Sequence, residues 1–103
     1  MNTLSLSGTG ITNQSIPQLG RLKALAYLRV NDTALSDACM PYIGGVRGLV
    51  QLSLNGTGVS DVGIEALRGL KQLRHLDLSN TRVTPEGHAR LKAALPACNI
   101  YRR

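Results

Sequence analysis

Apolar residues recur along this chain at intervals of 24 positions. Within each copy they alternate with polar residues, as in Leu52-Ser53-Leu54 and Leu76-Asp77-Leu78, which is typical of a strand with one buried face. One repeating column consists of Leu4, Leu28, Leu52, Leu76 and Ile100, and a second column consists of Leu6, Val30, Leu54 and Leu78. The pattern predicts a short strand at the start of each of four copies, and one more around residue 100.

The second half of each copy has helical spacing. Ile64, Leu67 and Leu70 lie three residues apart and would share one face of a helix. Each such segment follows a hydroxyl residue, and Thr84-Pro85-Glu86 has the composition of a helix N-terminus, so we expect Ser36, Ser60 and Thr84 to act as N-caps. Pro17 and Pro41 lie five residues beyond the hydroxyl positions. Their helices should therefore start late or be partly 3₁₀.

A unit of one short strand and one short helix has no partner for its own apolar side. Stacked units bury it, with strands paired in parallel and helices along the opposite side. We therefore expect a single domain over residues 1–103. Its predicted units are about 1–24, 25–48, 49–72 and 73–96, followed by a closing strand at 97–103.

These repeats resemble the leucine-rich repeat family over the whole chain. The family motif LxxLxL recurs as Leu25/Leu28/Val30, Leu49/Leu52/Leu54 and Leu73/Leu76/Leu78. Thr9, Thr33, Thr57 and Thr81 occupy the position where the family commonly has Asn or Cys, which resembles the threonine-type 24-residue repeats of bacterial proteins. The resemblance implies an α/β solenoid with parallel strands on a concave face and short helices on a convex face. We expect the threonines to pass hydrogen bonds between neighbouring turns.

Composition and charge add two points. The chain has no Phe or Trp, so the core must be aliphatic. The net charge is +6 and the pI is about 10.0, which keeps weak binding of nucleic acid or anionic surfaces as an alternative function. No aromatic residues interleave with the basic ones to stack on bases, so nucleic acid is the less favoured partner. Lys23, Arg47 and Lys71 recur after the helices, and we interpret them as cations near helix C-termini rather than an anion site.

The sequence indicates no catalytic, metal or cofactor site. Cys39 and Cys98 have no ligand spacing, and we expect both to be buried thiols. His75, Asp77 and Ser53 would share one face of the sheet, but no nucleophile elbow, phosphate-binding loop or deep pocket accompanies them, so we predict no enzyme activity. The N-terminus has no features of a signal peptide and no apolar stretch is long enough to span a membrane. We therefore expect a cytoplasmic protein, unless the chain belongs to a longer exported one.

The outward strand positions are the candidate binding surface for a protein or peptide. Tyr and Arg are common interface anchors, and the remaining outward residues are polar and suited to hydrogen bonding. The candidate residues are Tyr27, Arg29, Asn31, Gln51, Ser53, Asn55, His75, Asp77 and Tyr101. The alternative interpretation of this face is a solvated sheet with no ligand.

The first repeat predicts a second candidate surface, because the chain enters its first strand directly. Its apolar residues would then lack cover on one side, unlike the polar end at Arg102 and Arg103. This N-terminal edge comprises Leu4, Leu6, Ile11, Ile16 and Leu19. It could dock on another chain or form a homodimer, so a self-associating scaffold subunit is the alternative to a binding module.

Overall fold

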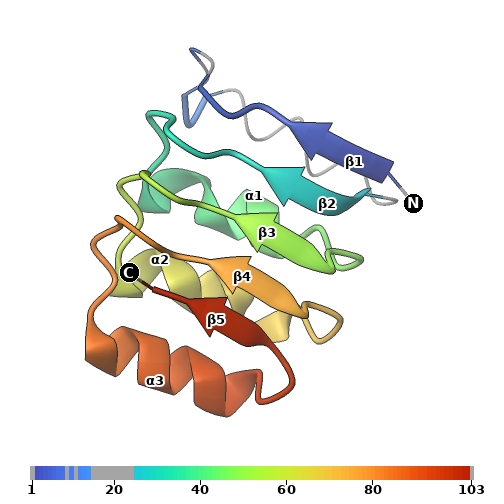
Figure 1. The fold of residues 1–103 in the computed structure, drawn as a ribbon, viewed down its shortest axis with the longest axis vertical. Coiled ribbons are helices and arrows are strands. Elements are labelled where there is room, and N and C mark those ends of the chain that lie inside the picture. The colour runs from blue at the N-terminus through green and yellow to red at the C-terminus, as the bar shows by residue number, and fades with distance from the viewer. Residues whose placement is uncertain (1, 9, 11, 15–24, 103) are drawn as a thin grey trace.

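The computed structural model describes residues 2–8, 10, 12–14 and 25–102. Five short strands form one parallel sheet in chain order, and they stack along the longest axis of the molecule (Figure 1). The strands are β1 (Asn2–Ser5), β2 (Leu25–Arg29), β3 (Gln51–Ser53), β4 (His75–Asp77) and β5 (Asn99–Tyr101). The predicted parallel strands are therefore all present.

The register of the sheet advances by 24 residues at each step. Leu4 pairs with Leu28, Leu28 with Leu52, Leu52 with Leu76, and Leu76 with Ile100. Past the strands the pairing continues through backbone hydrogen bonds, such as those from the Leu54 N–H to the Asp77 carbonyl (2.9 Å) and from the Leu78 N–H to the Tyr101 carbonyl (2.7 Å). Like residues thus lie on like residues, as the repeating columns predicted.

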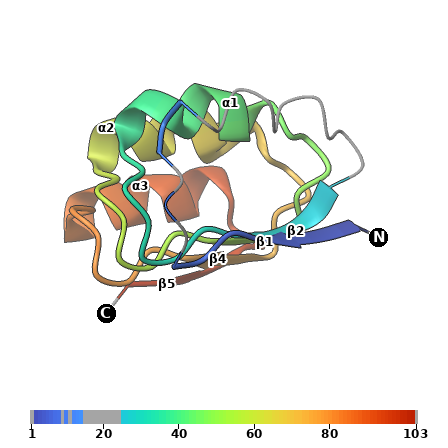
Figure 2. The same cartoon turned by 90° about the horizontal axis from the view of Figure 1, so that it is seen from above.

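The helices cover one face of the sheet, and the other face is left uncovered by them (Figure 2). They are η2 (Asp37–Cys39), α1 (Met40–Gly44), α2 (Asp61–Ile64), η3 (Glu65–Gly69) and α3 (Pro85–Ala94). The prediction for Pro41 is confirmed, because a 3₁₀ turn precedes α1 and Pro41 lies in its first turn. Pro17 lies outside the described residues. The α2–η3 segment is also partly 3₁₀ although it contains no proline.

The core between sheet and helices is aliphatic, as predicted. Its fully buried side chains come from strands, turns and helices alike, and none of the described buried residues is aromatic. The largest are Leu28, Leu35, Met40, Ile43, Leu49, Leu52, Leu54, Ile64, Leu67, Leu70 and Leu73. Burial of a leucine side chain contributes about 1.5–3 kcal/mol, so this column packing supplies the main stabilising free energy.

The three described members of the threonine column do not bridge neighbouring turns, and for them the prediction is wrong; Thr9 lies outside the described residues. Each hydroxyl donates to the carbonyl three residues earlier in its own turn: Thr33 to Val30 (2.8 Å), Thr57 to Leu54 (2.7 Å) and Thr81 to Leu78 (2.6 Å). The nearest acceptor is therefore in the same unit. The threonines close each turn and leave the stacking to other groups.

The turn after each strand has one residue in the left-handed region. These residues are Gly8, Asp32, Gly56 and Asn80, with φ between 54° and 75°, and they again lie 24 apart. Glycine, Asp and Asn tolerate this conformation better than other residues. A Cβ on Gly56 would also collide with the carboxylate of Asp32 in the unit before it, so this position has two reasons to be glycine.

A second set of side chains joins the units at their helix starts, and we call it the cap ladder. Its first rung is Asn13, whose amide bonds the hydroxyl and the N–H of Ser36. The carboxylate of Asp37 accepts from the Ser60 N–H (2.8 Å) and hydroxyl (2.5 Å). Asp61 accepts in the same way from the Thr84 N–H (2.8 Å) and hydroxyl (2.5 Å). Each helix start is thus bound to the unit before it.

The cap ladder changes the predicted capping. The Thr84 hydroxyl also accepts from the Gly87 N–H (3.2 Å), so Thr84 is the N-cap that the sequence predicted. Ser36 and Ser60 do occupy the N-cap positions of their helical segments, but their side chains accept no helix N–H, so the predicted capping bond is absent there. The Ser60 hydroxyl donates to Asp37, as the Thr84 hydroxyl donates to Asp61.

Two glycines make room for this ladder. A Cβ added to Gly63 would collide with the carboxylate of Asp37, and one added to Gly87 would collide with that of Asp61. Gly69, in contrast, has no atom within 4 Å of the place where its Cβ would lie. Substitution by alanine should therefore change the stability of the fold in opposite directions at Gly63 or Gly87 and at Gly69.

We expect Gly63→Ala to destabilise the fold and Gly69→Ala to leave it unchanged or stabilise it. In an exposed helical turn alanine is favoured over glycine by about 0.5–1 kcal/mol. At Gly63 the displaced carboxylate should outweigh this gain, with a net loss of about 1–3 kcal/mol. Urea unfolding followed by circular dichroism measures both. If Asp37→Ala does not reduce the cost of Gly63→Ala, the collision is not its cause.

Candidate functional site

The face of the sheet opposite the helices has a shallow open depression of about 270 Å³ across strands β2 to β5. Side chains alternate along each strand, so in β4 His75 is exposed, Leu76 is buried and Asp77 is half-buried. The depression is lined by Arg29, Asn31, Gln51, Leu52, Ser53, His75, Leu76, Asp77 and Tyr101. Seven of these were predicted from the sequence as outward strand positions.

Ser53 forms part of this lining and is less accessible than its strand position predicts. Its exposure is 8%, and its hydroxyl donates to the side-chain carbonyl of Asn31 (2.5 Å). The small side chain lies below the longer residues of the neighbouring strands. Ser53 is therefore a structural part of the depression, and its hydroxyl is already bonded.

Asn31 and Asn55 also hold the repeats together. The Asn31 amide oxygen accepts a second bond from the Asn55 N–H (2.9 Å), and the Asn31 N–H donates to the Ser7 hydroxyl (3.0 Å). The amide of Asn80 donates in turn to the Asn55 side chain (3.1 Å). Both candidate asparagines thus have structural partners, which the sequence alone did not predict.

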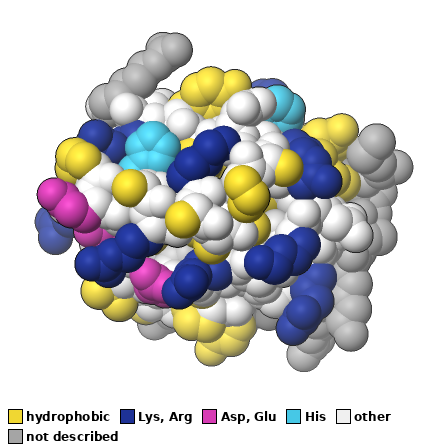
Figure 3. Space-filling model, turned by 90° about the horizontal axis from the view of Figure 1, so that it is seen from below, with side chains coloured by type: hydrophobic (Ala, Val, Ile, Leu, Met, Phe, Trp, Pro, Cys, Tyr) yellow, Lys and Arg dark blue, Asp and Glu magenta, His cyan; other side chains and the backbone are white. Residues whose placement is uncertain are grey.

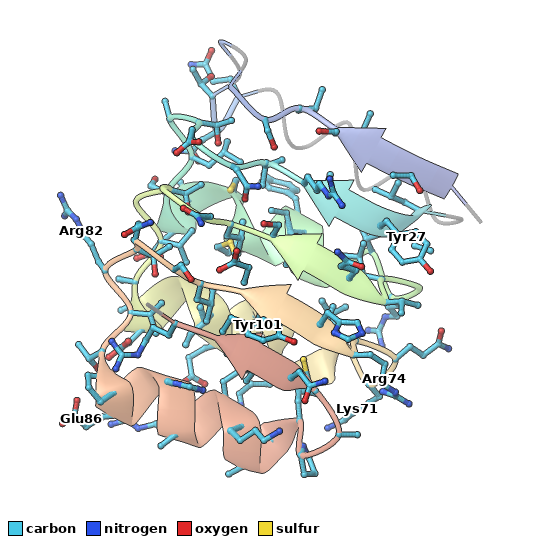
Figure 4. The ribbon with its side chains drawn as sticks, in the orientation of Figure 1. Tyr27, Lys71, Arg74, Arg82, Glu86 and Tyr101 are labelled. Carbon is cyan, nitrogen blue, oxygen red and sulfur yellow. The ribbon has the colours of Figure 1, made fainter. Side chains whose placement is uncertain are left out.

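The larger polar side chains remain at the surface. Arg29, His75 and Tyr101 are exposed, and Gln51 and Tyr27 are half-buried. Figure 4 shows Tyr27 on β2 and Tyr101 on β5, and Tyr101 lines the depression, whereas the predicted Tyr27 and Asn55 are not among its lining residues. Asp77 accepts one bond from the Ser79 N–H (2.9 Å) through a single carboxylate oxygen.

A positive and a negative charge flank the centre of the depression. Arg29, Ser53 and Asp77 are paired in register across three strands. Adjacent strands lie about 4.8 Å apart, which separates the Arg29 and Asp77 backbones by about 10 Å. The arrangement can hold a ligand by hydrogen bonds, one ion pair at each side and stacking on Tyr101.

The two serines beside Asp77 are not accessible as nucleophiles for acyl transfer. Ser53 is bonded to Asn31, and Ser79 is 4% exposed. The open, shallow surface does not exclude water from a reacting group. Among the described residues, no group of three or more His, Cys, Asp and Glu side chains could hold a metal ion.

Both cysteines are buried free thiols, as predicted. Burial raises the pKa of Cys39 and of Cys98, because the thiolate would be poorly solvated in the core. Cys39 also donates to the Ser36 carbonyl (3.2 Å). The two thiols are packing residues at neutral pH.

The N-terminal edge lies at β1, whose strand neighbour among the described residues is β2. Leu4 and Leu6 are half-buried and pack against the core. Ile11, Ile16 and Leu19 lie outside the described residues. The predicted docking surface at this edge thus stays a prediction.

Of the three basic residues interpreted as cations near helix C-termini, Lys71 bonds a carbonyl at a helix end, and Lys92, which was not among them, bonds carbonyls just beyond α3. Lys71 reaches the Ala94 carbonyl at the end of α3 (3.5 Å), and Lys92 donates to the Pro96 (3.1 Å) and Cys98 (2.6 Å) carbonyls. Lys23 lies outside the described residues, and Arg47 is exposed. In the described part of the chain, no helix is both long and apolar enough to cross a bilayer.

Comparison with known proteins agrees with this geometry. Residues 71–89 match the family described as a leucine-rich repeat. Over 97% of its length the chain is similar to a leucine-rich repeat protein of Leptospira interrogans, with a TM-score of 0.74 and 27% identity. The chain has the leucine-rich repeat fold. An internalin of Listeria monocytogenes shares the fold over 98% of the chain, with a TM-score of 0.64 and 21% identity.

This leucine-rich repeat chain spans 25% of the Leptospira protein and 34% of the internalin. No curated protein matches the sequence. Leucine-rich repeat proteins generally bind other proteins and are typically not enzymes. The threonine type of the repeats remains a prediction from their sequence.

Asp37 and Asp61 are the residues whose role the sequence predicted least well. Both are acids in the first turn of a helical segment. Their bonds to the next unit have a signal in the sequence, since the column reads Asn13, Asp37, Asp61 and then Pro85. Proline has no side-chain acceptor, so the cap ladder has its last carboxylate at Asp61.

The hydrogen bonds of the cap ladder lower the pKa of Asp61. The Thr84 hydroxyl and N–H hold the pKa of this carboxyl below its usual value, and the positive charges of Arg90 and Arg102 act in the same direction. A depressed folded-state pKa stabilises the fold above the ordinary pKa of an Asp, and this contribution is lost as the pH falls through the folded value.

We therefore expect Asp61→Asn to lower the free energy of unfolding at about pH 7, with a smaller effect at about pH 3. Urea unfolding at both pH values measures the difference. In a Thr84→Val background, where the donating hydroxyl is absent, the pH dependence of the Asp61→Asn effect should shrink. If Asp61→Asn has an equal effect at both pH values, the bonds from Thr84 do not stabilise the ionised Asp61 carboxylate in the folded state.

Proposed function

We propose that this chain is a protein-interaction module that binds a short peptide or loop of a protein in the depression on its sheet face. The single observation that carries the proposal is the convergence of Arg29, His75, Asp77 and Tyr101 from three different strands on that depression. Leucine-rich repeat proteins of similar fold support the general class. Tyr and Arg are also the residue types that most often anchor protein interfaces.

The size of the face favours a short ligand. Five strands span about 20 Å across the sheet, and strands of three to five residues are about 10–15 Å long. The area is a few hundred Å², below the ~800 Å² per partner of a standard interface. A segment crossing β2 to β5 fits this area, whereas a large flat protein surface would need further contacts.

The charges of the face favour a ligand with both signs. An acidic group would pair with Arg29 on β2, and a basic group with Asp77 on β4. The side-chain oxygens of Asn31, Asn55 and Ser53 already take part in hydrogen bonds within the fold, so they are less available to a ligand than the charged groups. The test of the proposal therefore reverses the charges of Arg29 and Asp77.

The ligands for the test are peptides of about twelve residues, selected from a random library for binding to the wild-type chain. We expect the double charge reversal Arg29→Glu/Asp77→Lys to abolish the binding of these peptides. Loss of two ion pairs at an interface should weaken binding by about tenfold or more. Isothermal titration measures the affinity, and amide chemical shifts in a nitrogen-15 spectrum locate the peptide on β2 to β5.

The matched control exchanges an ion pair on another surface. Arg68 and Glu65 form a pair at 3.1 Å on η3, and Arg68→Glu/Glu65→Lys also leaves the net charge unchanged. Peptide binding should survive this exchange. Selected peptides that bind the sheet-face reversal as well as they bind the wild type would overturn the proposed function.

A further inference from the structure

The positive charge of this chain is concentrated in its last third. Residues 68–103 contain eight of the twelve Lys and Arg residues and two of the six acids, whereas residues 1–67 contain four of each sign. The whole net charge of +6 therefore belongs to the last units. Because the units stack in chain order, the charge gathers at one end of the solenoid.

We call this surface the basic end, and it surrounds α3 and β5. Its members are exposed side chains from the turn before β4, the loop before α3, α3 itself and the residue after β5. They are Lys71, Arg74, Arg82, Arg90, Lys92 and Arg102. Figure 3 shows Lys and Arg side chains spread over this end of the molecule, with few acidic ones among them.

These charges are not neutralised within the described part of the chain. Its one ion pair joins Arg68 to Glu65, away from the six cations of the basic end. Lys71, Arg74 and Lys92 donate to backbone carbonyls, which fixes their position but leaves their charge. Arg90 and Arg102 lie close enough to Asp61 to lower its pKa, so the positive potential of this end stabilises the charged form of a neighbouring carboxylate.

The basic end also has apolar area between its charges. Ala89, Ala93, Pro96 and Ala97 are exposed on and just after α3, and Figure 3 shows apolar side chains between the basic ones. A protein partner can pack against such atoms, whereas a phosphate backbone gains little from them. Tyr101 is the exposed aromatic residue nearest to this end, and it belongs to the sheet-face depression. Among the residues of α3 there is no Phe, Tyr or Trp to stack on a base, and His88 is half-buried.

We propose that the basic end is a second interaction surface, which docks an acidic segment or surface of a partner protein. The whole molecule is 25 by 18 Å across its two shorter axes, which limits the size of this end. An area on the order of 450 Å² is about half of one side of a standard interface, so the docking should be weak and sensitive to salt. This inference is independent of the sheet-face depression, because the two surfaces share no residue.

The test uses fluorescence anisotropy with two labelled probes at about 50 mM salt. One is a peptide of about twelve residues rich in Glu with interspersed Leu, and the other is a single-stranded oligonucleotide of similar charge. We expect the peptide to bind more tightly than the oligonucleotide, and its binding to weaken steeply as salt is added. Tighter binding of the oligonucleotide, or no measurable peptide binding, would overturn the proposal.

Two double variants separate the surface from the net charge. Arg82→Glu/Arg90→Glu and Arg47→Glu/Arg68→Glu change the charge of the chain by the same amount, but only the first pair lies on the basic end. The first should weaken peptide binding by about tenfold or more, and the second by less than about threefold. Equal losses would show that overall charge alone attracts the peptide. Circular dichroism melting checks that both variants are folded.

Discussion

Parallel backbone pairing at a register of 24 residues is the constraint on which the rest of this structure depends. Once Leu28 lies between Leu4 and Leu52, every other column is stacked as well, and a single aliphatic core runs the length of the solenoid. Each unit contributes one strand and one short helical segment, neither of which would be stable in isolation. Stability therefore comes from contact between units, and side chains that link one unit to the next matter more than those that act within one.

Two kinds of polar link reinforce this stacking, one on each side of the core. On the sheet side, Asn31 joins the turns of neighbouring units, and on the helix side Asp37 binds the start of the next helix. Gly63 gives the Asp37 carboxylate its space, so that link requires two residues from different units. On the sheet face, Arg29, His75 and Tyr101 remain exposed.

The repeating leucines were sufficient to predict the strands, their order, their register and the aliphatic core. With a fixed period of 24 residues, there is only one register in which equivalent residues of successive units lie beside each other. The partners of the hydroxyl groups were not predictable in the same way. The 24-residue period places threonine on threonine but does not say which acceptor each hydroxyl uses, and in the structure the Thr57 hydroxyl bonds the Leu54 carbonyl of its own turn. The sheet-face depression was predicted as a set of outward positions, but the burial of Ser53 depends on the lengths of the side chains beside it.

The depression is lined by residues from four strands, and this has a consequence for unfolding. In the solenoid each strand contacts its immediate neighbours only, so units at some distance from each other are coupled weakly and the ends can open separately. A peptide that touches both Arg29 on β2 and Tyr101 on β5 connects units that the chain itself does not bring into contact. Binding of such a ligand would couple the units from β2 to β5, so that these repeats would unfold in one cooperative transition.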